Sequence, residues 1–271
     1  MSTIFDGKLF SLQKNEELKK EVLDLNTKGK FPHLASIVIG DNPASKLYVS
    51  LKKKAGESIG IQVDIYYIPE FTKKEDIITL IKTLNVDSEF SGIMVQLPIP
   101  GSLSKFKEEI INTIDLLKDV DGLRENSPFV HPTSKAAIEI LNLAKTLKEV
   151  KDLVIKKICV VGSTGMVGKP LVKELKKEGY EVLEVNRETD NLQNFTLQAD
   201  VVISCTGVAG LIKKDMLNED VVVIDIGSPK GDFSEDVSDI ASFVTPVPGG
   251  VGPVTVACLL ENLVQSVGKN D

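Results

Sequence analysis

The first half of the chain alternates between helical and extended spacing of its apolar residues. A charged segment with apolar residues at helical spacing predicts a helix over residues 8–28, which Gly29 ends. Thr72 and Glu75 form a capping-box pattern, which predicts the start of another helix. The pattern predicts strands over 34–40, 62–68 and 92–97, and helices over 45–59, 72–84 and 104–114.

The second half repeats this alternation after residues 119–132, a segment rich in turn formers that we interpret as a domain junction. Strands that alternate with helices indicate parallel sheets covered by helices on both faces. The sequence therefore predicts an α/β fold of two domains. In this half it predicts helices over 133–147, 169–177 and 254–267, and strands over 157–161, 181–185, 201–204 and 221–225.

The composition is that of an ordinary globular protein and disfavours several functions. Of the 271 residues, 42% are hydrophobic and 26% are charged, with a net charge of −7. A net negative charge disfavours sequence-independent nucleic-acid binding. No apolar run approaches the ~18 residues of a membrane span, and no signal-peptide pattern opens the chain. We therefore expect a cytoplasmic protein with no membrane association.

Cysteine and histidine usage disfavours disulfides and metal sites. The three cysteines form no CxxC pattern, and the two histidines, His33 and His131, lie far apart in the sequence. This pattern predicts a reducing compartment and no metal site. No GxSxG motif supports a serine hydrolase.

A glycine-rich turn is the strongest functional signal. Gly162, Gly165 and Gly168 follow the predicted strand over 157–161 and precede a predicted helix. Glycine lets the backbone approach a diphosphate closely, and the helix N-terminus offers free N–H donors. The spacing is GxxGxxG rather than the usual GxGxxG, so a tight turn without a ligand stays an alternative.

The residues after the next strand indicate which cofactor binds. Dinucleotide-binding folds place the adenosine ribose here, where an acidic residue favours NAD and an arginine favours the phosphate of NADP. Asn186 is neutral and Arg187 is cationic, which favours NADP. Glu184 and Glu188 lie nearby, so NAD stays possible.

Tyr48 and Lys52 lie four residues apart in a predicted helix and so share one face. A phenol and an ammonium group side by side can tune each other's pKa and pass a proton. The alternative is a surface pair in a lysine-rich stretch. The pair resembles the Tyr-x-x-x-Lys of short-chain dehydrogenases, but there it follows the glycine-rich turn and here it precedes it.

Three further segments carry polar or conformationally restricted residues. Gln96 ends a predicted strand just before two prolines, at the kind of strand end where α/β sheets bind ligands. Asp121 precedes Gly122, and its carboxylate suits either an amide ring edge or an Asx turn. Residues 246–253 combine three prolines with three glycines, which indicates a backbone shaped for a site.

Together these segments resemble the bifunctional methylenetetrahydrofolate dehydrogenase/cyclohydrolase family. The resemblance implies a folate-binding catalytic domain over residues 1–130 and 254–271 and a Rossmann-like NAD(P)-binding domain over 131–253. It also implies a cleft between the domains and a homodimer. The motifs that carry it are Asp6-Gly-Lys8, Asn42-Pro-Ala-Ser45 with Tyr48 and Lys52, Val95-Gln96-Leu-Pro98, Lys118-Asp-Val-Asp121-Gly122, residues 162–170 and Pro248-Gly-Gly-Val-Gly-Pro253.

The resemblance implies two reactions of one-carbon metabolism. NADP oxidises methylenetetrahydrofolate to the methenyl form, and water opens that product to 10-formyltetrahydrofolate. By resemblance Lys52 handles protons, Tyr48 borders the folate, Gln96 tunes Lys52 and Asp121 holds the pterin. Further folate contacts are implied for Ser45, Leu97, Pro98, Pro248, Gly249 and Gly250. Cofactor contacts are implied for Thr133, Gly162, Ser163, Thr164, Gly165, Val167, Gly168, Arg187, Gly207, Ser228 and Thr255.

The chain departs from the family pattern at several cofactor positions. Ser163 stands where the family often has arginine, so recognition of the NADP phosphate depends more on Arg187. Gly227-Ser228-Pro229 replaces the usual Gly-Ile-Asn, and residues 230–242 form a shortened segment. Pro132-Thr133-Ser134 replaces Cys-Thr-Pro and keeps only the threonine.

Three other functions fit parts of the sequence. A dehydrogenase without cyclohydrolase activity is disfavoured by the presence of Lys52 and Gln96. A folate- or nucleotide-binding protein without turnover is the second alternative. The third is a short-chain dehydrogenase, which a large N-terminal domain without a glycine turn disfavours.

Overall fold

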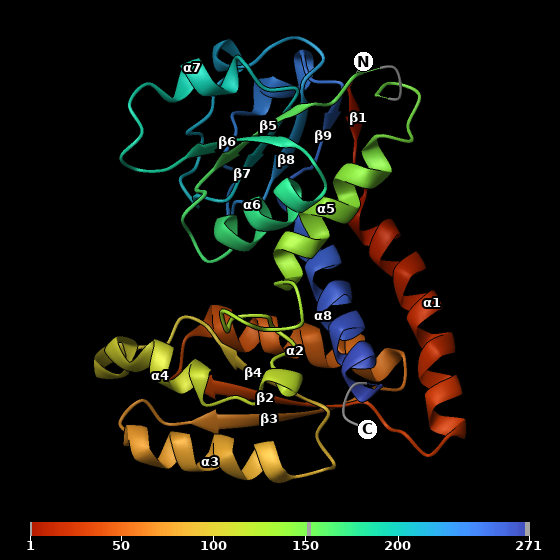
Figure 1. The fold of residues 1–271 in the computed structure, drawn as a ribbon, viewed down its shortest axis with the longest axis vertical. Coiled ribbons are helices and arrows are strands. Elements are labelled where there is room, and N and C mark those ends of the chain that lie inside the picture. The colour runs from red at the N-terminus through yellow and green to blue at the C-terminus, as the bar shows by residue number, and fades with distance from the viewer. Residues whose placement is uncertain (1, 151–152, 269–271) are drawn as a thin grey trace. The chain divides into compact units, whose positions relative to one another are not determined.

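The computed structural model describes residues 2–150 and 153–268, which form two compact units, each with its own parallel sheet (Figure 1). The three-stranded unit comprises Leu12–Pro132 and Val256–Asp271. The six-stranded unit comprises Met1–Ser11 and Thr133–Thr255. These sheets confirm the predicted two-domain α/β fold.

The three-stranded sheet has the order β3-β2-β4, and its strands are parallel. The central strand β2 (His33–Ile39) is buried along its whole length, as expected of a strand covered on both faces. The other elements of this unit, two of which extend into the six-stranded unit, are α1 (Gly7–Thr27), α2 (Pro43–Ser58), β3 (Gln62–Ile68), α3 (Lys74–Val86), β4 (Gly92–Gln96), α4 (Lys107–Asn112) and α8 (Val251–Val267).

Two apolar clusters cover the two faces of this sheet. Ile37 of β2 and Ile93 of β4 pack with Ile81 of α3 on one face. Leu34 of β2 packs with Leu263 of α8 on the other. Figure 1 shows the same layers, with α3 on one side of the sheet and α8 on the other. The alternation of side chains along each strand thus supplies both clusters.

The ends of two helices show where local sequence signals succeed and fail. The side chain of Asn42 caps α2 by accepting a hydrogen bond from the Ser45 N–H at 3.1 Å. The capping box predicted at Thr72 is wrong, because Lys73 is the N-cap of α3 and makes no side-chain capping bond. The N–H of Thr72 instead donates to the Pro69 carbonyl in a turn, at 3.0 Å.

The six-stranded sheet has the order β1-β9-β8-β7-β5-β6, and all its strand pairs are parallel. The strand order reverses at β5, because β6 lies on one side of it and β7 on the other. Such a switch point is where open α/β sheets bind ligands. The elements are β1 (Thr3–Ile4), α5 (Pro132–Ala144), β5 (Lys157–Val161), α6 (Gly168–Lys177), β6 (Glu181–Val185), α7 (Leu192–Thr196), β7 (Val201–Ser204), β8 (Val222–Asp225) and β9 (Phe243–Val244).

The N-terminal segment joins the six-stranded sheet. Thr3 and Ile4 pair with Phe243 and Val244. Residues 1–11, which the sequence groups with residues 12–130, therefore lie in the six-stranded unit. A strand of two residues shows no alternation, so β1 and β9 leave no periodic signal in the sequence.

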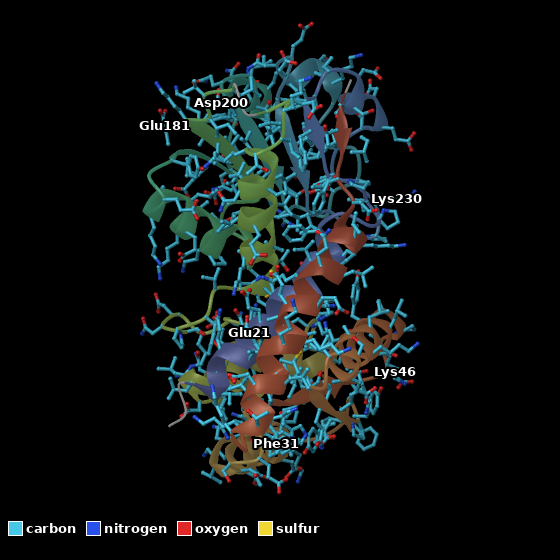
Figure 2. The ribbon with its side chains drawn as sticks, turned by 90° about the vertical axis from the view of Figure 1, so that its right-hand side faces the viewer. Glu21, Phe31, Lys46, Glu181, Asp200 and Lys230 are labelled. Carbon is cyan, nitrogen blue, oxygen red and sulfur yellow. The ribbon has the colours of Figure 1, made fainter. Side chains whose placement is uncertain are left out.

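Charged side chains lie on the surface of both units. Glu21 on α1 and Glu181 at the start of β6 are exposed and are labelled in Figure 2. In the part of the chain that the structure describes, no helix combines the length and apolar character needed to cross a membrane.

Candidate active site

The centre of the candidate site is the buried amine of Lys52 on α2. Only 9% of Lys52 is exposed, and its Nζ donates a hydrogen bond to Oε1 of Gln96 at 3.0 Å. The sulfur of Met94 lies 3.7 Å from the same nitrogen. Burial lowers the pKa of Lys52, and the nearby carboxylate of Asp121 opposes that shift. The site therefore favours a neutral amine more than a surface lysine does.

Gln96 is oriented by its own backbone neighbour. Its Nε2 donates to the carbonyl of Leu97 at 2.9 Å, so Oε1 faces Lys52 as the acceptor. Gln96 is the last residue of β4, and the Leu97–Pro98 peptide that follows is cis. Leu97 is half-buried and Pro98 is exposed, so the loop directly after Gln96 presents apolar surface.

Tyr48 lies one helical turn before Lys52 and is 42% exposed. The shared helix face predicted from the sequence is therefore present, but its two members differ in burial. Ser45, at the start of the same helix, is buried. The predicted folate contacts of this unit thus come from α2, from the end of β4 and from the turn that holds Asp121.

A buried carboxylate shapes the turn that presents Asp121. Asp119 is fully buried and accepts hydrogen bonds from the backbone N–H groups of Leu123 at 3.3 Å and Arg124 at 2.9 Å. Burial raises the pKa of Asp119 to about 6, although these bonds oppose the shift. Asp121, two residues later, is only half-buried. Its charge partly offsets the lowering of the pKa that burial causes at both Lys52 and His131.

His131 is a member of this cluster that the sequence analysis missed. It is 6% exposed, and burial lowers its pKa. The Asp121 carboxylate opposes this lowering, and the Lys52 charge adds to it. The sequence analysis also missed Met94. Neither His131 nor Met94 has a characteristic spacing from Lys52 in the sequence, so no motif points to them.

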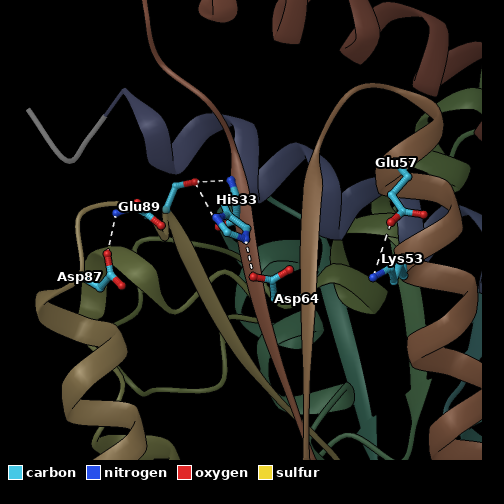
Figure 3. A network of polar contacts seen from close by, with 7 residues as sticks. His33, Lys53, Glu57, Asp64, Asp87 and Glu89 are labelled. Atoms are coloured by element: carbon cyan, nitrogen blue, oxygen red, sulfur yellow. Dashed lines mark hydrogen bonds and ion pairs between the residues drawn. The ribbon is translucent and has the colours of Figure 1, made fainter.

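A separate polar network lies at the other end of the same sheet (Figure 3). Nε2 of His33, the first residue of β2, is 3.1 Å from Oδ2 of Asp64. Ser91 bonds the backbone of His33 rather than its ring, through the His33 N–H at 2.8 Å and carbonyl at 3.3 Å. These three residues therefore lack the Ser–His contact of a hydrolase triad.

The glycine-rich turn of the six-stranded unit has the geometry expected of a diphosphate site. Gly162 has φ of +91°, and a Cβ on Gly168 would lie 2.1 Å from the Gly162 carbonyl oxygen. The hydroxyl of Ser163 is buried without a hydrogen-bond partner among the described residues. Thr164 and Gly165 are exposed just before α6. An open helix N-terminus beside an unpaired hydroxyl fits a bound dinucleotide.

Arg187 lies two residues after the end of β6, is exposed, and forms no ion pair with the residues that the structure describes. Its acidic neighbour Glu184 is engaged by Lys176, at 2.6 Å. Asn186 closes the turn by accepting from the Glu188 N–H at 2.8 Å. The guanidinium is therefore available for an anion at the place where the adenosine ribose is expected.

Asp232, which the sequence analysis also missed, organises the turn after β7. Its Oδ2 accepts from the Ser204 hydroxyl at 2.7 Å and from the backbone N–H groups of Thr206 at 2.8 Å and Gly207 at 3.3 Å. Asp225 accepts from the N–H groups of Gly227 and Asp232, which closes the short loop that holds Ser228. Ser228 itself is exposed.

The remaining predicted residues also lie in the six-stranded unit. The N–H of Gly7 donates to the Gly249 carbonyl at 3.1 Å, so the proline–glycine loop packs on the start of the chain. Gly250 donates to the Pro246 carbonyl at 2.9 Å. The Thr255 hydroxyl bonds its own helix. Pro248, Gly249 and Gly250 thus belong to a different unit from Lys52. Thr133 lies at the N-terminus of α5. Val167 lies directly before α6.

Both halves of the chain match one protein family. Residues 5–121 match the catalytic domain described as tetrahydrofolate dehydrogenase/cyclohydrolase, and residues 132–271 match the NAD(P)-binding domain of the same description. The chain belongs to this family.

Relatives from several organisms share nearly the whole length. The bifunctional protein FolD of Lactobacillus acidophilus is 40% identical, over 98% of this chain and 97% of that protein. FolD of Methanosarcina barkeri is 37% identical, over 99% and 97%. The structure of the Campylobacter jejuni FolD enzyme is 35% identical, with a TM-score of 0.90 and 100% of both chains covered. The Trypanosoma brucei enzyme, solved with NADP and an inhibitor, is 28% identical with a TM-score of 0.89, over 99% and 98%.

Family membership confirms the resemblance drawn from the motifs and the two-domain α/β fold. The predicted residues lie in both units, with Ser45, Tyr48, Lys52, Gln96, Leu97, Pro98 and Asp121 in one and the others in the six-stranded unit. The roles of the individual residues remain predictions.

Proposed function

We propose that this family member oxidises 5,10-methylenetetrahydrofolate to 5,10-methenyltetrahydrofolate with NADP and hydrolyses the product to 10-formyltetrahydrofolate. Matches to both domains of the family support the two reactions. The structural observation that carries the proposal is the buried amine of Lys52, held by Gln96 and close to the charge of Asp121.

In the first reaction the methylene carbon loses a hydride, and NADP held by the six-stranded unit would supply the two-electron acceptor. The folate is left as a methenyl cation. A neutral amine at Lys52 tolerates this developing positive charge, whereas an ammonium group would repel it. Burial of Lys52 favours the neutral form, and so favours hydride departure.

In the second reaction water adds to the methenyl carbon and one proton is released. The bond from this carbon to N5 then breaks, and the hydroxyl proton is transferred to N5, which leaves the formyl group on N10. We assign proton transfer to the Lys52 amine, which Gln96 orients by accepting one of its N–H bonds. Asp121 accepts hydrogen bonds from the pterin, and the exposed ring of Tyr48 borders the folate. We assign further folate contacts to Ser45, Leu97 and Pro98 in this unit, and to Pro248, Gly249 and Gly250 in the six-stranded unit.

The six-stranded unit is proposed to bind the cofactor. Its glycine-rich turn receives the diphosphate on backbone N–H groups, and Arg187 meets the 2′-phosphate that distinguishes NADP from NAD. The turn after β7, with Gly207, and the loop with Ser228 border the nicotinamide half. Thr133, Ser163, Val167 and Thr255 complete the proposed contacts.

We also propose that the protein acts as a homodimer in the cytoplasm, as the family resemblance implies. Sedimentation velocity of the purified chain tests the first point, and a species at twice the chain mass is the expected result. A monomer at working concentration would contradict it.

The first test follows cofactor reduction by absorbance with methylenetetrahydrofolate, with NADP and NAD in parallel. Reduction with NADP preferred is expected. Preference for NAD would overturn the role of Arg187 and keep the enzyme. No reduction with either cofactor would favour a folate-binding protein without turnover.

The second test replaces the proposed proton acceptor. Lys52→Met is expected to abolish hydrolysis of methenyltetrahydrofolate, because the side chain keeps its length and loses its amine. Lys53→Met is the matched control, since Lys53 is partly exposed and its Nζ pairs with Glu57 at 3.6 Å. Unchanged hydrolysis in Lys52→Met would overturn the role of Lys52.

A further inference from the structure

Asn262 on α8 links two backbone segments of the candidate site. The residue is 1% exposed, and its Nδ2 donates to the carbonyl oxygens of Val120 and Val130, both at 2.9 Å. Val120 immediately precedes Asp121, and Val130 immediately precedes His131. One side-chain nitrogen therefore restrains both ends of the loop that presents the site's carboxylate.

Contacts within the loop also hold its two ends together. Gly122 has φ of +61°, and a Cβ there would lie 2.6 Å from the Phe129 carbonyl and 2.8 Å from the His131 nitrogen. The hydroxyl of Ser127 donates to the Asp119 carbonyl at 3.2 Å. The backbone on both sides of Asp121 is thus packed against the segment that ends at His131.

We propose that Asn262 is a positioning residue of the folate site, which holds the Asp121 carboxylate in place beside Lys52 by tying the Val120 and Val130 carbonyls together. The inference rests on the proposed function. In this proposal Asn262 of the last helix acts on folate binding indirectly, through the loop that carries Asp121.

The chemistry of the amide explains why asparagine occupies this position. A single NH₂ group has two N–H bonds and can reach two acceptors at once. Serine has one donor and leucine has none. The carboxylate of an aspartate has only acceptor oxygens, which would repel both carbonyl oxygens. Loss of Asn262 removes this donor from the buried Val120 carbonyl and the part-buried Val130 carbonyl, so the two ends of the loop are no longer held together by the amide.

Ser266 provides a matched control on the same helix. It is fully buried one turn further along α8, and its hydroxyl oxygen lies 2.9 Å from the Ser91 carbonyl and 2.6 Å from the Leu263 carbonyl, so its one proton can reach either acceptor. Ser266→Ala therefore removes a buried link from α8 to the rest of the unit without touching the loop over 119–131.

The experiment compares Asn262→Leu, Asn262→Ser and Ser266→Ala in the full chain, with steady-state kinetics of both reactions. We expect Asn262→Leu to raise the KM for the folate substrate at least tenfold in both reactions, with the KM for NADP within twofold of the wild type. Asn262→Ser, which restores one donor, is expected to be intermediate. Ser266→Ala is expected to lower Tm and leave both KM values within twofold.

A second readout, hydrogen–deuterium exchange, separates this inference from the proposed function. Peptides covering 119–131 should exchange at least fivefold faster in Asn262→Leu than in the wild type, and at the wild-type rate in Ser266→Ala. If Asn262→Leu does not fold, the same comparison is made with Asn262→Ser. A folded Asn262 variant with wild-type folate KM and wild-type exchange would overturn the inference. If the wild type turns over neither substrate, the proposed function fails, and exchange alone then decides whether Asn262 restrains the loop.

Discussion

The side chains of Lys52 and Gln96 meet at 3.0 Å although 44 residues separate them in the chain. Lys52 comes from a helix and Gln96 from the last position of a strand, so the packing of α2 against the three-stranded sheet creates the contact. The amide oxygen of Gln96 can accept from the amine in either protonation state. A neutral acceptor adds no negative charge, so it does not oppose the lowering of the Lys52 pKa that burial causes.

Gln96→Glu should therefore reduce cyclohydrolase activity at neutral pH. A carboxylate 3.0 Å from Lys52 stabilises the ammonium form and raises its pKa, so less neutral amine is present. We expect at least a tenfold loss at pH 7 and a pH–rate profile whose rise moves to higher pH. Gln62→Glu, an exposed change at the start of β3, should leave the profile unchanged. An unshifted profile in Gln96→Glu would show that this contact does not tune the amine.

Arg187→Ala should weaken NADP binding while leaving NAD nearly unaffected. The exposed guanidinium has no acidic partner among the described residues, so its loss removes a charge-assisted contact to the 2′-phosphate. A loss of about 2 kcal/mol corresponds to a rise of about thirtyfold in the KM for NADP. Parallel kinetics with both cofactors measure it. Lys177→Ala, an exposed charge on α6, is the control, and equal changes with NADP and NAD would contradict the assignment.

Gly168→Ala should damage the cofactor site through its backbone. The new Cβ would lie 2.1 Å from the Gly162 carbonyl oxygen, so the glycine-rich turn must open. We expect a higher KM for NADP, a lower Tm, and an unchanged rate of methenyl hydrolysis in the folded fraction. Gly268→Ala is the control, because its nearest neighbouring atom would be 3.9 Å away. Wild-type affinity for NADP in Gly168→Ala would show that the turn does not contact the cofactor.

The stability of the protein should carry a pH dependence from Asp119. The pKa of this group is raised from 3.8 to about 6 in the folded state, so the folded chain binds its proton more tightly than the unfolded chain. Its contribution is favourable below about pH 4 and is lost as the pH rises through about 6, a change of about 3 kcal/mol. Between pH 4.5 and 7, urea unfolding should show about 2 kcal/mol of this change in the wild type and none of it in Asp119→Asn. The same pH dependence in both proteins would contradict it.

Much of the fold could be predicted from local patterns. Strand β5 and the turn that follows were predictable because an apolar run and three glycines lie within twelve residues. The capping box at Thr72 failed because the chain before α3 forms a turn through the Pro69 carbonyl instead. The two-residue strands β1 and β9 are held by their partners in the sheet, and no local pattern reveals them.

The sequence by itself determined the family, the alternation of strands and helices, and the identity of Lys52, Gln96 and Asp121 as candidates, because motifs and periodicity are properties of neighbouring residues. Only the tertiary structure decided that Lys52 is buried against Gln96. It alone revealed the link from Asn262 to the loop that presents Asp121. Burial and hydrogen bonding between distant residues depend on how elements pack, and they set the pKa values and positions on which the proposed chemistry depends.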